Sequence, residues 1–220
     1  MHPIEQHILR LLALNSSQRF SQLKPAEIES NLFMYHLRKL IGAGMVEKVE
    51  LGYKLSLEGC QYVDSSSLHS FTVRLQPKMV TFVACENAAG EWLLYRRKHH
   101  PYIGRIGFPY GKIYLGEGIQ HSAERELAEK TGLQAKLQHK GDVYITTYQK
   151  GELLTQMFGH VFYGKNPEGN LKEHSEIGEC FWQKIEDIDD ARFFPGFKEL
   201  YKIMQKPASE RFFAELICEE

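Results

Sequence analysis

Residues 111–133 constrain the fold more than any other stretch of the chain. They predict a loop, a helix and a glycine stop. Gly111 and Gly116 punctuate the loop, since glycine favours turns. Residues 122–130 contain no glycine, proline or β-branched residue, so a helix forms there at little cost. Gly132 lies where a residue in the left-handed conformation would end that helix.

The polar side of the predicted helix carries two carboxylates and an ammonium group. Glu126, Glu129 and Lys130 follow one another at spacings of three and four, which places them on one helical face. Carboxylate oxygens are the hard ligands that Mg²⁺ prefers, and that ion commonly binds substrate phosphates as well. The alternative for the pair Glu126–Lys130 is an ordinary surface ion pair, worth about 0.2–0.5 kcal/mol.

The spacing of this stretch is similar to the signature of the Nudix family. That signature is a glycine, five residues, a glutamate, seven residues, Arg-Glu, an aliphatic residue, any residue, Glu-Glu, any residue, glycine and an aliphatic residue. The positions in register are Gly111, Glu117, Arg125, Glu126, Leu127, Glu129, Gly132 and Leu133. Lys130 departs from the pattern, because the family has the second glutamate of the Glu-Glu pair there, usually a principal metal ligand.

The resemblance implies an α/β protein whose C-terminal part is a Nudix α/β/α sandwich with a mixed sheet. It implies hydrolysis of a diphosphate linked to another group, commonly a nucleoside, with Mg²⁺ as cofactor and Mn²⁺ as the alternative. Glu126 and Glu129 would hold the metal, Arg125 would orient the carboxylates, and Glu117 would support that network.

An acidic loop residue near the end of a Nudix domain often adds a metal ligand or a base. Here the resemblance implies Glu179 as a further metal ligand. The general base stays open among Glu126, Glu176 and Glu179.

Cations and aromatic residues precede the signature and are candidates for substrate binding. Arg96, Arg97 and Tyr102 lie just before it, and Lys130 lies within it. Such side chains can hold phosphate and stack against a base. A solvated basic loop is the alternative for residues 96–102. His99 and His100 lack further ligands nearby, so a transition-metal site is not expected there.

The N-terminal region predicts three helices followed by a hairpin and a fourth helix. The helices are expected over 4–14, 21–28, 30–41 and 56–63, and the strands over 45–49 and 53–55. The third helix, with Ser30 or Asn31 as its cap, is expected to turn Leu37, Leu40 and Ile41 inward. This order resembles the winged helix-turn-helix domain of bacterial transcription regulators.

In such domains the third helix often enters the major groove of DNA. The candidate DNA-binding residues on that helix and on the hairpin are Tyr35, Arg38, Lys39, Lys48 and Lys54. Acidic and basic residues are nevertheless balanced across residues 1–64, whereas DNA-binding modules usually carry a basic stripe. A winged helix used for dimerisation or protein contact is therefore the alternative.

The polar stretch 64–70 predicts a linker between a winged-helix domain, 1–70, and a Nudix domain, 71–220. Strands are expected over 79–85, 91–97, 141–148, 153–163 and 180–183, and a helix after Pro195. A final helix capped by Ser209 is expected to turn four apolar residues toward a partner surface: Phe212, Phe213, Leu216 and Ile217.

Composition narrows the class of protein. The chain has 220 residues, 43% of them hydrophobic, and a net charge of −1. Its four cysteines are scattered, which is typical of a reducing compartment. No apolar run approaches the ~20 residues of a membrane span. With no secretion signal at the start, a cytoplasmic protein without membrane contact is expected, and a homodimer is an open alternative.

Two functions follow from these patterns. The first is a magnesium-dependent Nudix hydrolase of a nucleoside-diphosphate-linked small molecule, weakened by Lys130. The second is a transcription regulator with a DNA-binding winged helix, whose Nudix domain senses a nucleotide-like ligand without cleaving it. A third hypothesis is a module that only binds other molecules and has no catalytic activity.

Overall fold

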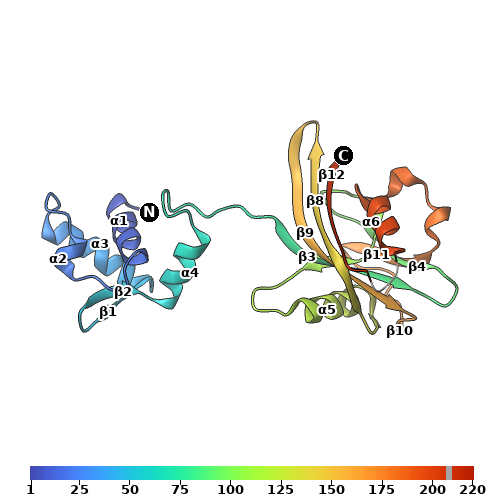
Figure 1. Ribbon diagram of the computed structural model, residues 1–220, viewed down its shortest axis with the longest axis horizontal. Helices are drawn as coiled ribbons and strands as arrows, with labels where there is room; N and C mark the ends of the chain where they lie inside the picture. The colour runs from blue at the N-terminus through green and yellow to red at the C-terminus, as the bar shows by residue number, and fades with distance from the viewer. Residues whose placement is uncertain (207–209) are drawn as a thin grey trace. The chain divides into compact units, whose positions relative to one another are not determined.

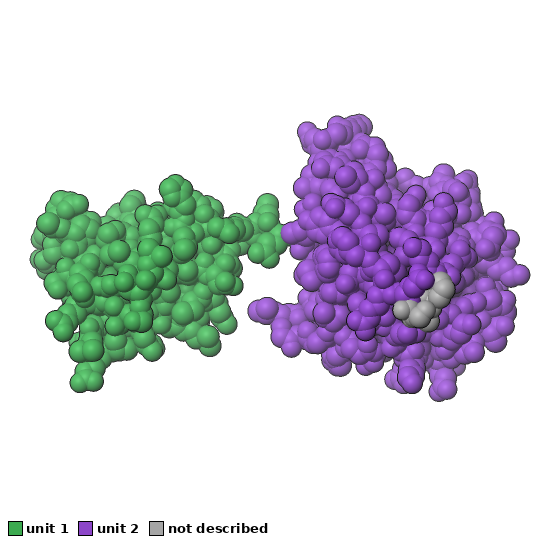
Figure 2. Space-filling model, in the orientation of Figure 1, with its two compact units in different colours: residues 1–76 green, residues 77–220 purple. Residues whose placement is uncertain are grey.

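The computed structural model describes residues 1–206 and 210–220. The chain forms two compact units, Met1–Gln76 and Pro77–Glu220, which are coloured separately in Figure 2. Among the residues described, no helix combines the length and apolar character that a membrane crossing requires.

The N-terminal unit is a winged helix. Its elements are three helices, a two-stranded antiparallel hairpin and a fourth helix (Figure 1): α1 Pro3–Ala13, α2 Phe20–Leu23, α3 Ser30–Gly42, β1 Val46–Val49, β2 Gly52–Leu55 and α4 Leu57–Ser65. The apolar faces of the helices meet in one core, whose fully buried members are Ile8, Leu9, Leu23, Phe33 and Leu37.

Details of this unit differ from the sequence-based expectation. The second helix ends at Leu23, because Lys24 precedes a proline and adopts an extended conformation. Glu29 rather than Ser30 or Asn31 occupies the position before the third helix. Ile41 is 36% exposed, so its predicted inward position was wrong.

The N-terminal unit also extends further along the chain than expected. Helix α4 continues to Ser65, and Ser66 forms an isolated β-bridge with Val73. Phe71, expected to open the second domain, is buried in the core of the N-terminal unit. An apolar side chain inside the polar stretch therefore ties residues 66–73 to the helices.

The C-terminal unit is built on an eight-stranded mixed sheet. Six strands follow one another in the spatial order β11-β4-β3-β9-β8-β12, with the parallel pairs β3–β9 and β8–β12. Their bounds are β3 Lys78–Glu86, β4 Trp92–Arg97, β8 Gln138–Gln149, β9 Glu152–Lys165, β11 Gly178–Gln183 and β12 Phe212–Glu219. Two short strands, β5 Ile106–Gly107 and β6 Tyr110–Lys112, pair with β4 and β3. Outside this sheet, β7 Leu133–Gln134 pairs with β10 Glu168–Gly169.

Helices cover both faces of this sheet, as expected for an α/β/α sandwich (Figure 1). On one face, α5 (Ile119–Thr131) packs Ala123 and Leu127 against Val83. On the other face, α6 (Phe197–Met204) packs Leu200 against Ile145. Two single 3₁₀ turns, η1 Ile185–Asp187 and η2 Asp190–Arg192, precede α6 in the chain. The expected α/β class with a mixed sheet is confirmed.

The predicted final helix was wrong. Residues 212–219 form β12, which pairs in parallel with β8. Burial alternates along this strand, with Phe212 and Leu216 half-buried and Phe213 and Ile217 exposed. Apolar residues at 212, 213, 216 and 217 have a spacing that also fits a helix. Here the free edge of β8 pairs with them instead, so the segment is a strand. The predicted cap Ser209 lies outside the described residues.

Candidate active site

Helix α5 and the loop before it bring the signature residues together. Gly132 ends the helix with φ of 71°, the left-handed conformation that the sequence predicted. Gly111, on β6, lies directly against the Glu126 carboxylate, and a Cβ atom built at Gly111 would overlap that group. The glycine therefore allows a carboxylate on α5 to approach the strand backbone.

Arg125 organises the acidic residues. Its guanidinium donates to Glu117 at 2.6 and 2.9 Å, to Glu126 at 2.8 Å and to Glu129 at 3.2 Å. These bonds raise the pKa of Arg125, with the contact to Glu117 making the largest contribution. The same contact lowers the pKa of Glu117 to about 2. The Tyr114 ring lies 4.1 Å from the guanidinium carbon and covers it.

Lys130 takes a definite place in this cluster. Its ammonium nitrogen lies 3.2 Å from Glu126 Oε2, and its side chain is only 17% exposed. The rings of Tyr110 and Tyr95 lie 5.0 and 5.4 Å from that nitrogen. Burial lowers the pKa of Lys130, and the neighbouring carboxylate opposes that shift. This contact is more enclosed than a typical surface ion pair.

The donor set fits a hard cation only in part. Glu126 and Glu129 project from the same face of α5, and the Glu129 side chain is 60% exposed. Both oxygens of Glu126 already bind a cationic side chain, Oε1 the Arg125 guanidinium and Oε2 the Lys130 ammonium. A divalent ion shared by Glu129 and Glu126 would compete with Lys130 for Glu126 Oε2.

A cleft of about 630 Å³ opens over this cluster. That volume falls within the ~300–1,000 Å³ of ordinary ligand sites. Its lining contains five cationic side chains, two carboxylates and four tyrosines: Lys78, Arg97, Lys112, Lys130, Lys172, Glu126, Glu129, Tyr95, Tyr102, Tyr110 and Tyr114. Burial and the neighbouring cations Lys112 and Arg97 lower the pKa of Lys78. The cleft thus combines an excess of positive charge with aromatic surface.

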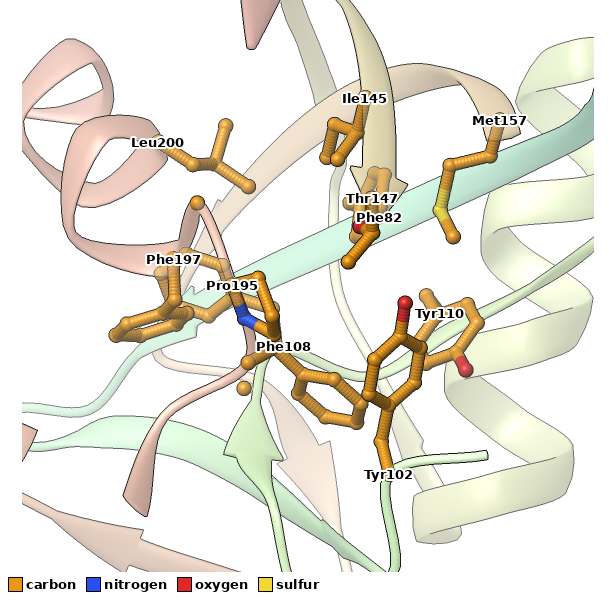
Figure 3. A pocket seen from close by; sticks show the side chains of 13 residues that line it. Phe82, Tyr102, Phe108, Tyr110, Ile145, Thr147, Met157, Pro195, Phe197 and Leu200 are labelled. Atoms are coloured by element: carbon orange, nitrogen blue, oxygen red, sulfur yellow. The ribbon is translucent and has the colours of Figure 1, made fainter. Parts of the chain in front are cut away.

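The cleft also adjoins a small apolar pocket of about 50 Å³ on the α6 side of the sheet. Figure 3 shows Tyr102 and Tyr110 beside this pocket, with Phe197 and Leu200 on its α6 side. The Tyr102 hydroxyl lies 2.7 Å from Thr155 Oγ1, and the Tyr110 hydroxyl accepts from Arg97. Two tyrosines therefore separate the charged cleft from the apolar interior.

Comparison with known families decides the classification. The sequence profile of the NUDIX domain matches residues 76–205. The chain belongs to the Nudix family. Nudix proteins typically use a divalent metal, and the partial cation site on α5 lies at the corresponding signature.

Solved structures agree with this fold. The mutator MutT protein of Bacillus halodurans is 22% identical, with a TM-score of 0.53 over 64% of this chain and 89% of that one. The MutT NUDIX hydrolase of Burkholderia pseudomallei is 20% identical, with a TM-score of 0.51 over 60% and 100%. The NUDIX domain of Shewanella oneidensis NrtR, crystallised with ADP ribose, is 16% identical, with a TM-score of 0.50 over 66% and 94%.

Not every expected site residue of the Nudix domain reaches the cleft. The expected residues that do line the cleft are Arg97, Tyr102, Lys130, Glu126 and Glu129.

Arg96 and Glu179 do not line the cleft. They are cross-strand partners on β4 and β11, bonded at 3.0 Å, and Lys98 also contacts Glu179 at 3.1 Å. That lysine contact lowers the pKa of Glu179. Side chains alternate along a strand, so Arg96 points away from the face that carries Arg97. Glu176 is exposed and lies between two residues that line the cleft, Ser175 and Ile177.

Sequence reasoning missed three of the cations that line the cleft. Lys112 directly follows the first glycine of the signature, which is a signal that could have identified it. Lys78 opens β3 and Lys172 follows β10, and neither position has a local pattern that predicts its place. The strand pairings that bring them to the cleft are long-range.

The candidate DNA-binding residues of the winged helix differ in availability. Tyr35 is 61% exposed on α3. Lys39 binds the buried Glu5 carboxylate at 2.9 Å, and Lys54 binds Glu47 at 2.9 Å across the hairpin.

Arg38 and Lys48 are exposed and form no ion pair within the described part of the chain. The positive charge of α3 and the hairpin is therefore partly neutralised by the protein itself.

Proposed function

We propose that the cleft of the Nudix domain binds a nucleoside-diphosphate-linked small molecule and cleaves it slowly with magnesium. The observation that carries this proposal is that five cationic side chains line the cleft together with the two carboxylates of α5. A diphosphate brings concentrated negative charge, which would relieve the mutual repulsion of Lys78, Lys112 and Arg97. Burial lowers the pKa of Lys78 most, and the repulsion from Lys112 and Arg97 lowers it further.

The remainder of the ligand would bind the aromatic part of the cleft. Tyr102, Tyr110 and Tyr114 line it, and tyrosine rings stack against nucleobases. The ADP ribose in complex with the NrtR domain has this chemistry, a nucleoside and a second sugar joined through a diphosphate. A nucleotide-like ligand is therefore the class we expect, and the cleft offers no feature that selects one base.

Magnesium would be held by Glu126 and Glu129, with Mn²⁺ as an alternative ion. Bound there, it would supply charge neutralisation and activation of water. Arg125 would orient both carboxylates, and Glu117 would fix the guanidinium through its own two bonds. Lys130 competes for Glu126, so we expect weak magnesium binding and slow turnover.

Lys130 would also hold part of the diphosphate. Its ammonium group carries one positive charge and three donors, enough to bind a phosphate oxygen but not to replace a divalent ion in activating water. Ligand binding is therefore expected to persist partly without magnesium. The general base stays unassigned among Glu126, Glu176 and Glu179. Two cations hold each of Glu126 and Glu179, whereas Glu176 is exposed.

A second function is regulation of transcription, with the Nudix domain as a ligand sensor. The winged helix and the lysine at a ligand position favour it, and exposed Tyr35, Arg38 and Lys48 on α3 and the hairpin could contact DNA. We expect salt-dependent binding to a fragment of the protein's own operon region. No binding at low salt, with ADP ribose present or absent, would exclude this function.

Equilibrium binding and turnover of ADP ribose, with magnesium and with a chelator, test the first function. Lys172→Ala removes a cleft cation, whereas Lys136→Ala removes an exposed lysine that does not line the cleft. We expect the first variant to weaken binding about tenfold, the equivalent of about 1.4 kcal/mol, and the second to leave it unchanged. Equal affinities for both variants would remove the cleft from consideration.

A further inference from the structure

Three metal-binding side chains converge on the sheet in a place that the cleft does not use. His139 Nε2 lies 3.0 Å and His160 Nδ1 lies 2.6 Å from the same oxygen of Asp142. One ligand atom from each residue can be chosen so that all three lie within 4.8 Å of one another. Two imidazoles thus share one carboxylate oxygen, and the three residues offer their ligand atoms within a small space.

A β-bulge creates this convergence. Residues three apart on a regular strand face opposite sides of the sheet, so His139 and Asp142 should diverge. The pairing of β8 with β9 shifts between His139 and Gly141, where one extra residue is inserted. His139 then lies opposite Phe162 and Asp142 opposite His160, which are two residues apart on β9 and share a face. Bulges commonly re-aim side chains in this way.

Burial adds a second observation. His160 is 9% exposed, and its Nε2 atom has no hydrogen-bond partner among the described residues. The register partner of His160 on β3 is Thr81, whose buried hydroxyl is also without a described partner. Metal-bound histidines usually donate their second ring nitrogen to a neighbouring acceptor. The two unpartnered groups belong to register partners on adjacent strands, β3 and β9.

We propose that His139, Asp142 and His160 bind a borderline divalent transition-metal ion of the Zn²⁺ class. Ligand atoms about 2.0–2.2 Å from a tetrahedral ion lie roughly 3.3 Å apart. The contacts of 2.6 and 3.0 Å to Asp142 would lengthen slightly, and the two imidazole nitrogens, which lie within 4.8 Å of each other, would adjust to the same separation. Half-exposed His139 and Asp142 give an ion access from solvent. The fourth position would be left to water.

This site is chemically distinct from the one on α5. Imidazole nitrogens favour Zn²⁺, Co²⁺ and Ni²⁺, whereas the carboxylates Glu126 and Glu129 favour Mg²⁺ and Mn²⁺. The proposal is independent of diphosphate hydrolysis, because neither histidine nor Asp142 lines the cleft. A chain with both sites would respond separately to the two classes of ion.

Titration of the full chain with Co²⁺ tests the proposal, since tetrahedral cobalt has a characteristic visible absorption. Exposed Cys60 is changed to Ser throughout to remove an adventitious thiol ligand. We expect one Co²⁺ per chain, displaced by Zn²⁺, and a rise in melting temperature with Zn²⁺. Loss of an outer hydrogen-bond partner of a metal ligand weakens metal binding by about 10–100-fold. Asp142→Asn and His139→Gln each remove a ligand, so each should weaken Co²⁺ binding by more than that.

The matched control is His69→Gln, which removes an exposed imidazole from the N-terminal unit. It should keep the cobalt absorption and the affinity of the Cys60→Ser protein. Absence of cobalt binding at micromolar concentration would overturn the proposal. So would binding that survives both Asp142→Asn and His139→Gln.

Discussion

The substitution Lys130→Glu would restore the Nudix signature and should make the C-terminal unit depend on magnesium. It replaces the ammonium group 3.2 Å from Glu126 with a third carboxylate in the same enclosed place. Two like charges 4 Å apart repel by about 4 kcal/mol at an effective dielectric constant of 20. Breaking an enclosed ion pair by removing one partner costs roughly 3–5 kcal/mol. We therefore expect a loss of roughly 3–5 kcal/mol without metal.

Magnesium should offset much of this loss in the variant. An ion at 100 times its dissociation constant stabilises the folded state by about 2.7 kcal/mol. Each kcal/mol shifts the melting temperature of a unit of this size by roughly 2–4 °C. Both tryptophans, Trp92 and Trp182, lie in the C-terminal unit, so their fluorescence follows its unfolding alone. Melting curves with magnesium and with a chelator measure the effect directly.

Lys130→Met is the matched control, because it keeps the apolar stem between Tyr95 and Tyr110 but supplies neither charge nor ligand. It breaks the same ion pair but adds no like charge, so it should cost less than Lys130→Glu and show no added response to magnesium. The reasoning is refuted if Lys130→Glu melts at the wild-type temperature in chelator. It is refuted equally if magnesium stabilises wild type and variant alike.

Three further experiments test other parts of the account. Gly111→Ala should destabilise the C-terminal unit by roughly 1–3 kcal/mol in urea unfolding, because the added methyl group overlaps the Glu126 carboxylate. The control is Gly118→Ala, whose methyl group meets open space and should change the free energy of unfolding little. The pKa of Glu117 is lowered to about 2 in the folded protein, so its stabilising contribution is full above about pH 4.5 and is lost as the pH falls toward 2. In the Glu117→Gln variant, the free energy of unfolding should therefore depend less on pH within that window. Arg38→Ala should weaken DNA binding and reduce its salt dependence, and it should leave the melting temperature of the winged helix, measured by circular dichroism, unchanged. Lys39→Ala should lower that melting temperature, because it removes the partner of the buried Glu5 carboxylate.

The parts of the fold that sequence could predict are those set by local pattern. The α5 helix and its glycine stop follow from helix propensity and from the need for a left-handed residue at Gly132. The winged helix likewise follows from helical periodicity and a short turn. Glu126 and Glu129 share a face because their spacing imposes it.

The parts that sequence could not predict depend on pairing between distant strands. Residues 212–219 have an ambiguous apolar pattern, and the free edge of β8 decided it. Pairing of β4 with β11 placed Arg96 against Glu179, outside the cleft. The enclosure of Lys130 depends on Tyr95 and Tyr110, which come from two other strands. Spacing alone cannot show whether an ion pair at four residues is exposed or buried.

The most direct test of the central claim is calorimetric binding of ADP ribose to the wild-type chain, with hydrolysis followed in the same samples, in magnesium and in chelator. The account predicts binding in both conditions, tighter with magnesium, and slow turnover only when magnesium is present. Lys130→Glu should lose most binding in chelator and gain turnover in magnesium. A fast wild-type enzyme that Lys130→Glu slows, or a wild-type chain that binds no nucleoside diphosphate derivative in either condition, would contradict the account.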